Sequence, residues 1–262
     1  MTTTIAVVND AGSAGKTTTA VTLAAELALR GSRVLLVDLD SQANATAWTT
    51  GHTDHPVTVG DVLLRRATLE DATTASSVDG LQVLPAGEDL KHHRIELGRA
   101  LGPEQRLRHA LATTDHDVII LDCQAGAGEL LPLAALVAAD HALAVTLPSP
   151  KELEGLPRVE DMVEQVRDAY NPDLTLAAIV PCAVPARTRG RVYSDALDTL
   201  IDAYGTLVTP PVRQSVAAVQ SYDRRVPLPL SHPTAPLTRD YRAVTDHVTT
   251  ACLPATPAAQ AC

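Results

Sequence analysis

The sequence predicts an α/β fold in which a doubly wound, mostly parallel sheet is flanked by helices. Short, continuously apolar runs alternate with longer helix-like segments along the chain. Such runs are typical of parallel strands that are buried on both faces. The first run is followed by a loop of small residues and then a helix. Ligands in folds of this class bind at the carboxyl ends of the strands, so this loop is the first place to look for chemistry.

The elements can be assigned in order from these apolar runs. A helix is expected from about Lys16 to Arg30, and Gly31 stands where a helix C-cap is expected. The longest apolar stretch, residues 130–148, is interrupted by Asp140 and His141. It therefore predicts a helix, a turn and a buried strand, and no membrane span. The expected strands are residues 5–8, 34–37, 81–84, 118–121, 142–147, 174–180 and 206–208.

The composition indicates one ordinary globular domain. The 262 residues are 45% hydrophobic and 20% charged, which allows a substantial core. We expect a single domain over residues 1–252 and a disordered tail over 253–262, where Ala, Pro and Thr dominate. The start of the chain shows no signal peptide. The four cysteines are far apart, which excludes a CxxC metal site and fits a reducing cytosol.

Residues 9–18, Asn-Asp-Ala-Gly-Ser-Ala-Gly-Lys-Thr-Thr, carry the strongest chemical signal. Small residues between a strand and a helix let backbone N–H groups surround phosphate oxygens, and the helix N-terminus adds partial positive charge. Lys16 could reach the β- and γ-phosphates of ATP, and Thr17 could ligate Mg²⁺. The alternative is an ordinary tight turn. The expected nucleotide-binding residues are Ala11, Gly12, Ser13, Ala14, Gly15, Lys16, Thr17 and Thr18.

This loop resembles the variant P-loop of the ParA/MinD superfamily, K-G-G-x-G-K-[ST]-[ST]. Further segments resemble motifs of that superfamily in the same order, so the likeness covers most of residues 4 to 250. The length is similar to that of the short, Soj-like partition ATPases. The resemblance implies a P-loop NTPase fold of the deviant Walker A type, with ATP and Mg²⁺ as cofactors. These segments are residues 37–46, 58–64, 81–86, 118–123, 136–140 and 153–156.

The resemblance also implies roles for single residues. Asp40 would orient the attacking water and act with Lys16 as a catalytic residue. Asp38 would lie near the Mg²⁺ shell, and Asp122, at a strand end, would hold the ion. Pro211 would line the adenine pocket. The alternatives are a solvated acidic turn for Asp38 and Asp40, and a turn cap for Asp122.

The loop departs from the superfamily at one position that bears on catalysis. The superfamily's first lysine, which reaches across a dimer to the partner's phosphates, is Ala11 here. An alanine cannot supply that positive charge, so we expect ATP binding to persist and hydrolysis to be slow. Lys151, just after the strand at 142–147, could substitute for the missing cation. It could equally be a solvated lysine at a helix start.

Contacts with DNA would have to come from a local basic patch, because the net charge is −10. The resemblance implies that C-terminal arginines bind DNA without sequence preference, through phosphate neutralisation. The alternative is a solvated arginine-rich face. The candidate residues are Arg187, Arg189, Arg191, Arg213, Arg224 and Arg225.

The function implied by the resemblance is that of a cytoplasmic, nucleoid-associated partition ATPase. ATP would favour a homodimer that binds non-specific DNA, and a ParB-like, centromere-bound partner would trigger hydrolysis. The small neutral tail disfavours the membrane anchor of MinD-like proteins. One alternative is a nucleotide-binding but hydrolysis-impaired scaffold or regulator. Another is a metabolic P-loop enzyme of the same superfamily, such as a carboxylase or ligase.

Overall fold

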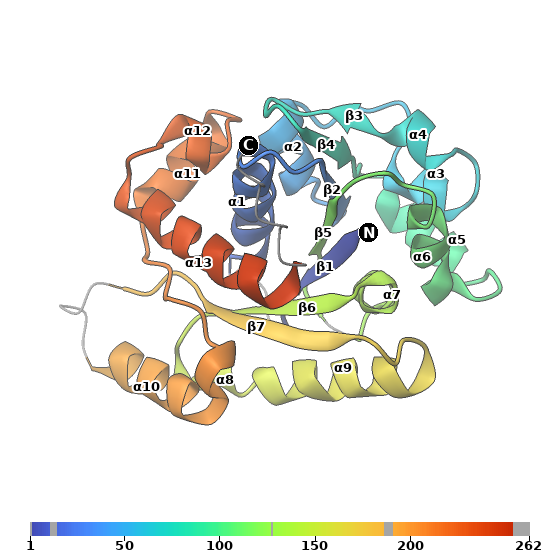
Figure 1. Cartoon of the computed structure of the whole chain (residues 1–262). Helices are drawn as coiled ribbons and strands as arrows, with labels where there is room; N and C mark the ends of the chain where they lie inside the picture. Colours follow the sequence, from blue (N-terminus) through green and yellow to red (C-terminus); the bar gives the residue numbers. More distant parts are fainter. Residues whose placement is uncertain (1, 11–14, 127, 186–190, 254–262) are drawn as a thin grey trace, which may run out of the picture.

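The computed structural model describes residues 2–10, 15–126, 128–185 and 191–253 (Figure 1). The described residues form one seven-stranded sheet in the order β3-β4-β2-β5-β1-β6-β7. Every pair of neighbouring strands is parallel except β3 and β4. The predicted fold class is therefore confirmed. The strands are β1 Thr3–Val8, β2 Val34–Leu39, β3 Thr74–Ala75, β4 Leu81–Leu84, β5 Val118–Cys123, β6 His141–Thr146 and β7 Thr175–Pro181.

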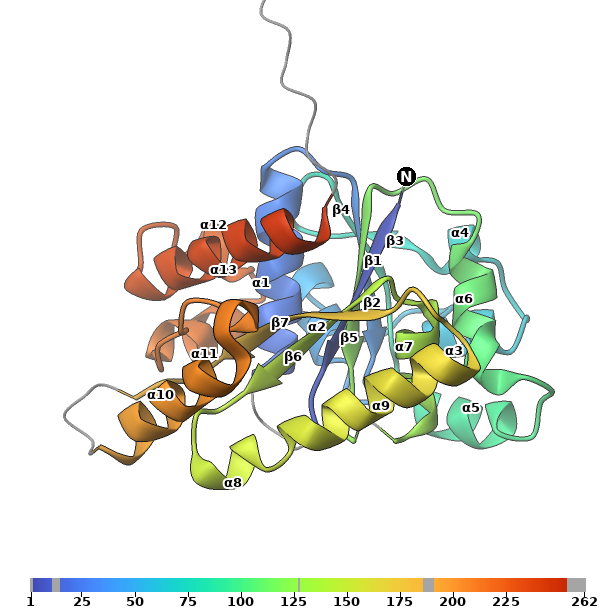
Figure 2. The same cartoon turned by 60° about the horizontal axis from the view of Figure 1, so that its bottom comes forward.

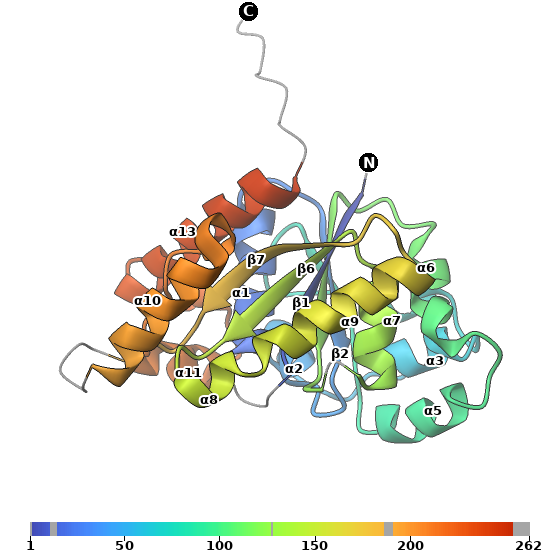
Figure 3. The same cartoon turned by 90° about the horizontal axis from the view of Figure 1, so that it is seen from below.

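Helices cover both faces of the sheet, as Figures 1 and 3 show. One face carries α1 Lys16–Leu29, α2 Asn44–Thr50, α11 Val216–Asp223, α12 Leu228–Ser231 and α13 Pro236–Cys252. The other carries α3 Val59–Leu63, α4 Leu69–Ala72, α5 Leu90–Leu97, α6 Arg106–Leu111, α7 Leu130–Ala138, α9 Leu156–Ala169 and α10 Val192–Tyr204. Three short pieces complete the helices, namely α8 Pro150–Leu153 and the 3₁₀ turns Pro103–Gln105 and Gly205–Leu207.

The central strands are apolar at successive positions because both of their faces are buried. In β2, Leu35 packs into the core beneath α3 and α7, and Leu36 packs into the core beneath α1 and α13. In β5, Ile119 and Ile120 divide in the same way. Side chains alternate between the faces of a strand, so a strand covered on both sides shows no polar alternation. This is the physical reason why continuous apolar runs predicted the sheet.

Two segments differ from the sequence expectation. The strand expected at 206–208 is wrong, because residues 205–207 form a 3₁₀ turn and only Val208 makes an isolated bridge, to Ile179. The two-residue strand β3 was not expected. The first helix lies close to its expected bounds. Gly31, with φ of 97°, donates its N–H to the Ala28 carbonyl and so ends it.

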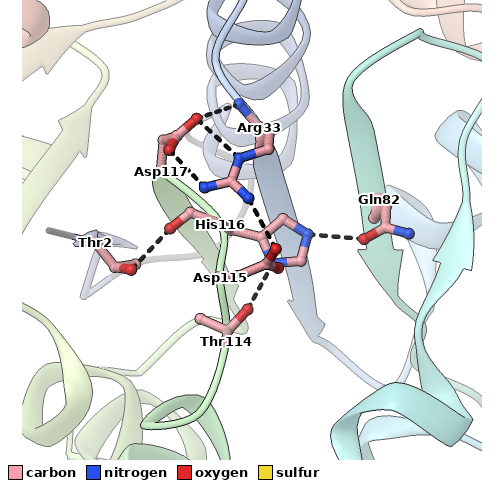
Figure 4. Close-up of polar contacts among 7 residues, drawn as sticks. All are labelled: Thr2, Arg33, Gln82, Thr114, Asp115, His116 and Asp117. Atoms are coloured by element: carbon pink, nitrogen blue, oxygen red, sulfur yellow. Dashed lines mark hydrogen bonds and ion pairs between the residues drawn. The ribbon is translucent and has the colours of Figure 1, made fainter.

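The amino-terminal edge of the sheet is closed by a polar network (Figure 4). The Arg33 guanidinium, just before β2, donates to Asp115 and Asp117, which precede β5. The His116 ring lies 2.8 Å from Gln82 Oε1 in β4. These contacts join the starts of three neighbouring strands. The opposite, carboxyl-terminal edge carries the residues that the sequence singled out for chemistry.

No helix among the described residues is long and apolar enough to cross a membrane. Leu253 packs against the core beside α13. The rest of the predicted tail, residues 254–262, lies outside the described residues. The division into a domain at 1–252 and a tail therefore stays a prediction.

Candidate nucleotide-binding site

The predicted phosphate loop joins the end of β1 to the start of α1. Of its residues, Ala11, Gly12, Ser13 and Ala14 lie outside the described residues. Gly15 is described and has φ of 91°. A side chain there would be strained, and its Cβ would lie 3.4 Å from the Cβ of Cys182. Gly15 is the N-cap residue of α1, and its positive φ lets the chain turn into the helix, whose first residue is Lys16.

Lys16 is 8% exposed and lies at the N-terminus of α1. Burial lowers the pKa of its ammonium group, because the charged form loses hydration. The carboxylates of Asp122, Asp40 and Glu152 and the Cys123 thiol oppose this shift. The structure therefore brings Lys16 within electrostatic reach of two of the three predicted acidic site residues.

Asp122 is fully buried in β5, beside Asp38 in β2. Burial, with a further contribution from Asp38, raises the pKa of Asp122 well above its usual range. The Thr17 hydroxyl and Lys16 are close enough to lower it in part. Even so, neither carboxylate oxygen has a hydrogen bond of normal geometry. A buried carboxylate without hydrogen bonds is costly, and a bound cation would offset that cost.

Asp38 is also fully buried, but its oxygens are satisfied. Oδ1 accepts the Asp40 N–H at 3.0 Å, and Oδ2 accepts the backbone N–H and the hydroxyl of Thr46 at 2.9 and 2.8 Å. Burial raises the pKa of Asp38 to about 6. The Thr46 hydroxyl also accepts the Ala86 N–H at 3.0 Å. Asp38 therefore organises the segment from Asp40 to Thr46, and its role near a metal ion stays a prediction.

Asp40 lies at the rim of the site and is half-buried. Its Oδ1 accepts the backbone N–H of Gln42 at 3.0 Å, which folds the side chain over its own turn. Gln42 is exposed. The carboxylate is thus held close to its own turn at the carboxyl end of β2, and its catalytic role also stays a prediction.

A cavity of about 190 Å³ opens beside Gly15, between the end of β7 and the start of α11. Pro211, predicted to line an adenine pocket, is exposed and does not line this cavity, whereas its neighbours Val212 and Arg213 do. No local sequence pattern points to Cys182 and Tyr241, which meet only in the fold. The lining residues are Gly15, Thr18, Cys182, Ala183, Val212, Arg213, Gln214, Ser215, Ala218, Leu237 and Tyr241.

A second cavity, of about 300 Å³, shares Thr18 and Ala218 with the first. The Tyr222 hydroxyl donates to Asn44 Oδ1 at 2.9 Å, and its ring packs edge-on against Trp48 with centroids 5.4 Å apart. This links α2, which begins just after the Asp40 turn, to α11. No local pattern in the sequence indicates this cluster. The lining residues are Thr17, Thr18, Asn44, Trp48, Ala218, Val219 and Tyr222.

The predicted DNA-contacting arginines differ in their exposure and in their contacts. Arg187 and Arg189 lie outside the described residues, while Arg191 is exposed at the N-cap of α10. Arg213 is held by both oxygens of Asp240, and Arg224 is exposed. The Arg225 guanidinium lies 4.4 Å from the ring centroid of Tyr222.

Two further cations lie on α8 and α9. Lys151 is exposed in α8, as expected of a solvated lysine. Arg158, in the first turn of α9, pairs with Asp10 at 2.9 Å while its side chain remains 73% exposed. Asp10 occupies the place of the first glycine of an ordinary P-loop, so this ion pair anchors the start of the loop to α9.

Comparisons with known proteins agree with this arrangement. Residues 2–176 match a family model described as an AAA domain. The chain is 38% identical over 184 residues to the chromosome partitioning protein ParA of Caulobacter vibrioides, covering 67% of each. It is 38% identical over 187 residues to the sporulation initiation inhibitor protein Soj of Bacillus subtilis, covering 70% of this chain and 74% of Soj. A crystal structure of cobyrinic acid a,c-diamide synthase from Mycobacterium smegmatis with bound ADP and magnesium superposes with a TM-score of 0.82 at 28% identity, covering 98% of this chain and all of that one.

Proposed function

This chain belongs to the ParA/MinD superfamily of P-loop ATPases, and we propose that it is a ParA-like partition protein that binds ATP with Mg²⁺. The observation that carries the proposal is Asp122, whose buried oxygens lack hydrogen bonds beside Lys16 and Thr17 at the start of α1. The M. smegmatis structure, with bound ADP and magnesium, supports the choice of ligand. The nucleotide phosphates would neutralise the charge of Lys16, and the ion would neutralise that of Asp122.

Each residue of the site has a part that follows from its place. The N-terminus of α1 and the Lys16 ammonium would bind the phosphates. Thr17 and Asp122 would hold Mg²⁺, directly or through water; no cluster of three or more His, Cys, Asp or Glu side chains suited to a metal occurs in the described part of the chain. The ion would neutralise phosphate charge. Asp40, fixed at the rim by its own turn, would orient the attacking water.

We propose that hydrolysis is slow, because Ala11 replaces a lysine. Losing one cation of that kind typically lowers the rate by about 10³-fold or more. The test compares turnover of the wild type, Asp40→Ala and Ala11→Lys. Turnover of the wild type above that of Asp40→Ala, and a further rise in Ala11→Lys, would support a slow ATPase. Equal turnover of the wild type and Asp40→Ala would instead favour the hydrolysis-impaired scaffold.

Arg158 is a candidate to replace the missing lysine, because it pairs with Asp10 at the start of the loop. Its guanidinium remains exposed while it contacts Asp10, and this contact favours Arg158 over Lys151 as a substitute for the missing lysine. If Arg158 serves this role, Arg158→Gln should lower turnover in the wild type but leave the turnover of Ala11→Lys nearly unchanged.

DNA binding would depend on a nucleotide-bound homodimer in the cytoplasm, with a ParB-like partner stimulating release. On α11, Val216 and Val219 are 72% and 70% exposed, and Val219 lines the cavity of about 300 Å³; together they offer apolar surface that a second copy could bury. Arg224 is the C-cap residue of the same helix. Retention of non-specific DNA should be strong with ATP and weak with ADP or without nucleotide. Retention that is the same in all three conditions would contradict the proposal.

The metabolic alternative is represented by the M. smegmatis synthase, which is 28% identical to this chain. ParA of C. vibrioides and Soj of B. subtilis are each 38% identical to it. We therefore propose partition over small-molecule ligation. Nucleotide-dependent retention on DNA separates the two, because a ligase has no need for it.

A further inference from the structure

A separate cavity of about 480 Å³ lies among α3, α4 and α6. Figures 1 and 2 place these helices at the opposite end of the molecule from α11 and α13, which border the cavities lined by Thr18. No residue lines both this cavity and either cavity beside Gly15. The lining residues are Val62, Arg65, Arg66, Ala67, Thr68, Leu69, Asp71, Arg106, His109, Ala110 and Thr113.

The cavity is lined by basic side chains together with apolar residues. Arg65, Arg106 and His109 line it, and within the described part of the chain their side chains make no hydrogen bond or ion pair. Two other charged residues line the cavity. Arg66 pairs with Glu96 at 2.7 Å, and Asp71 accepts the Thr68 hydroxyl at 2.6 Å in a helix cap and keeps its negative charge. Arg65 and Arg106 together outweigh that single carboxylate, so the cavity has net positive charge, although the whole chain carries −10.

Arg65 is held in a backbone conformation that arginine disfavours. Its φ is 61°, in the left-handed region. It follows the last turn of α3, where its N–H donates to the Val62 carbonyl and the next N–H donates to the Asp61 carbonyl. Glycine is the residue that suits this closing position. An arginine kept in a strained position at the mouth of a cavity points to a role for its side chain.

We propose that this cavity binds a phosphate group, carried by a small organic phosphate. Guanidinium groups match the geometry of phosphate oxygens, and Arg65 and Arg106 together supply two positive charges for a dianion, with His109 as a further hydrogen-bonding group. Val62, Leu69 and Ala110 provide a surface for the apolar part of the ligand. The cavity volume falls within the range of small-molecule sites.

Calorimetric titration of the full chain with phenyl phosphate, at constant ionic strength, tests the proposal. The decisive variant is Arg65→Gly, because glycine accommodates φ of 61° and the protein should unfold at the same temperature or up to about 4 °C higher. Affinity should fall at least about tenfold in Arg65→Gly and in Arg106→Gln. Arg99→Gly, which removes an exposed arginine outside the cavity, should bind like the wild type.

Two further arms separate this site from the P-loop and identify the source of the phosphate. Lys16→Ala alters the nucleotide site and not this cavity, so it should keep the binding event that Arg65→Gly and Arg106→Gln weaken. Tighter binding of phenyl phosphate than of inorganic phosphate supports an organic ligand, and equal binding supports free phosphate as the ligand of the same cavity. Unchanged affinity in Arg65→Gly, or loss of binding in Lys16→Ala, would overturn the proposal. So would tighter binding of a glutamate-rich peptide than of either phosphate.

Discussion

Replacing Asp122 by asparagine should stabilise the nucleotide-free protein while weakening its binding of Mg²⁺ and ATP. The carboxylate is fully buried, neither of its oxygens has a hydrogen bond of normal geometry, and the buried Asp38 lies beside it. Asparagine has nearly the same shape and carries no charge. The variant therefore removes an electrostatic penalty without opening a cavity.

The size of the effect can be estimated from the site itself. Asp38, buried in the same place but with three hydrogen bonds, still has a pKa of about 6, raised from 3.8. That shift corresponds to about 3 kcal/mol of destabilisation at neutral pH. Asp122 lacks such bonds, but it is attracted by Lys16, and the amide would remain without partners. We therefore expect a net gain of about 1–3 kcal/mol in the free energy of unfolding.

Thermal unfolding with and without Mg²⁺ and ATP measures both halves of this prediction. In the nucleotide-free state, Asp122→Asn should unfold roughly 2–12 °C above the wild type, given the usual scaling for a chain of this length. Added Mg²⁺ and ATP should raise the unfolding temperature of the wild type more than that of the variant. A lower unfolding temperature for the nucleotide-free variant, or equal stabilisation of both proteins by nucleotide, would refute the reasoning.

Three further perturbations follow from the same site. Thr46→Val removes the hydroxyl that joins Asp38 to the Ala86 N–H, so it should lower the free energy of unfolding by about 1–3 kcal/mol in urea titrations; no change would mean that these bonds are replaced. Burial raises the pKa values of Asp38 and Asp122, and a bound cation favours their ionised forms, so Mg²⁺ binding should release protons. The affinity for Mg²⁺ with ATP, measured by calorimetry, should therefore fall as the pH drops through about 6. A flat pH profile would count against these carboxylates as neighbours of the ion. Trp48 is the chain's only tryptophan and lines a cavity with Thr17 and Thr18, so its fluorescence should change on addition of Mg²⁺ and ATP in the wild type and stay constant in Lys16→Ala.

Much of the fold could be predicted from sequence because its signals are local. A strand buried on both faces is apolar at successive positions, as in Val34–Val37 of β2 and Val118–Leu121 of β5, and a glycine such as Gly31 marks the end of a helix. The two-residue strand β3 and the 3₁₀ turn at 205–207 were missed because so few residues carry no periodicity.

The candidate site divides in the same way. Lys16, Thr17 and Asp122 stand at strand and helix ends that the sequence reveals, so their proximity could be anticipated. The Asn44–Tyr222 hydrogen bond joins residues 178 positions apart, and no local pattern reports such a contact. The strained backbone of Arg65 was equally invisible, because an arginine after a helix looks like any solvated residue.

The central claim is that one ATP with Mg²⁺ binds at the start of α1, and calorimetric titration of the pure protein tests it most directly. We expect one binding event per chain in the wild type and its loss in Lys16→Ala, with Arg99→Gly binding as the wild type does. Absence of binding heat in the wild type, or the same affinity in Lys16→Ala, would contradict the account.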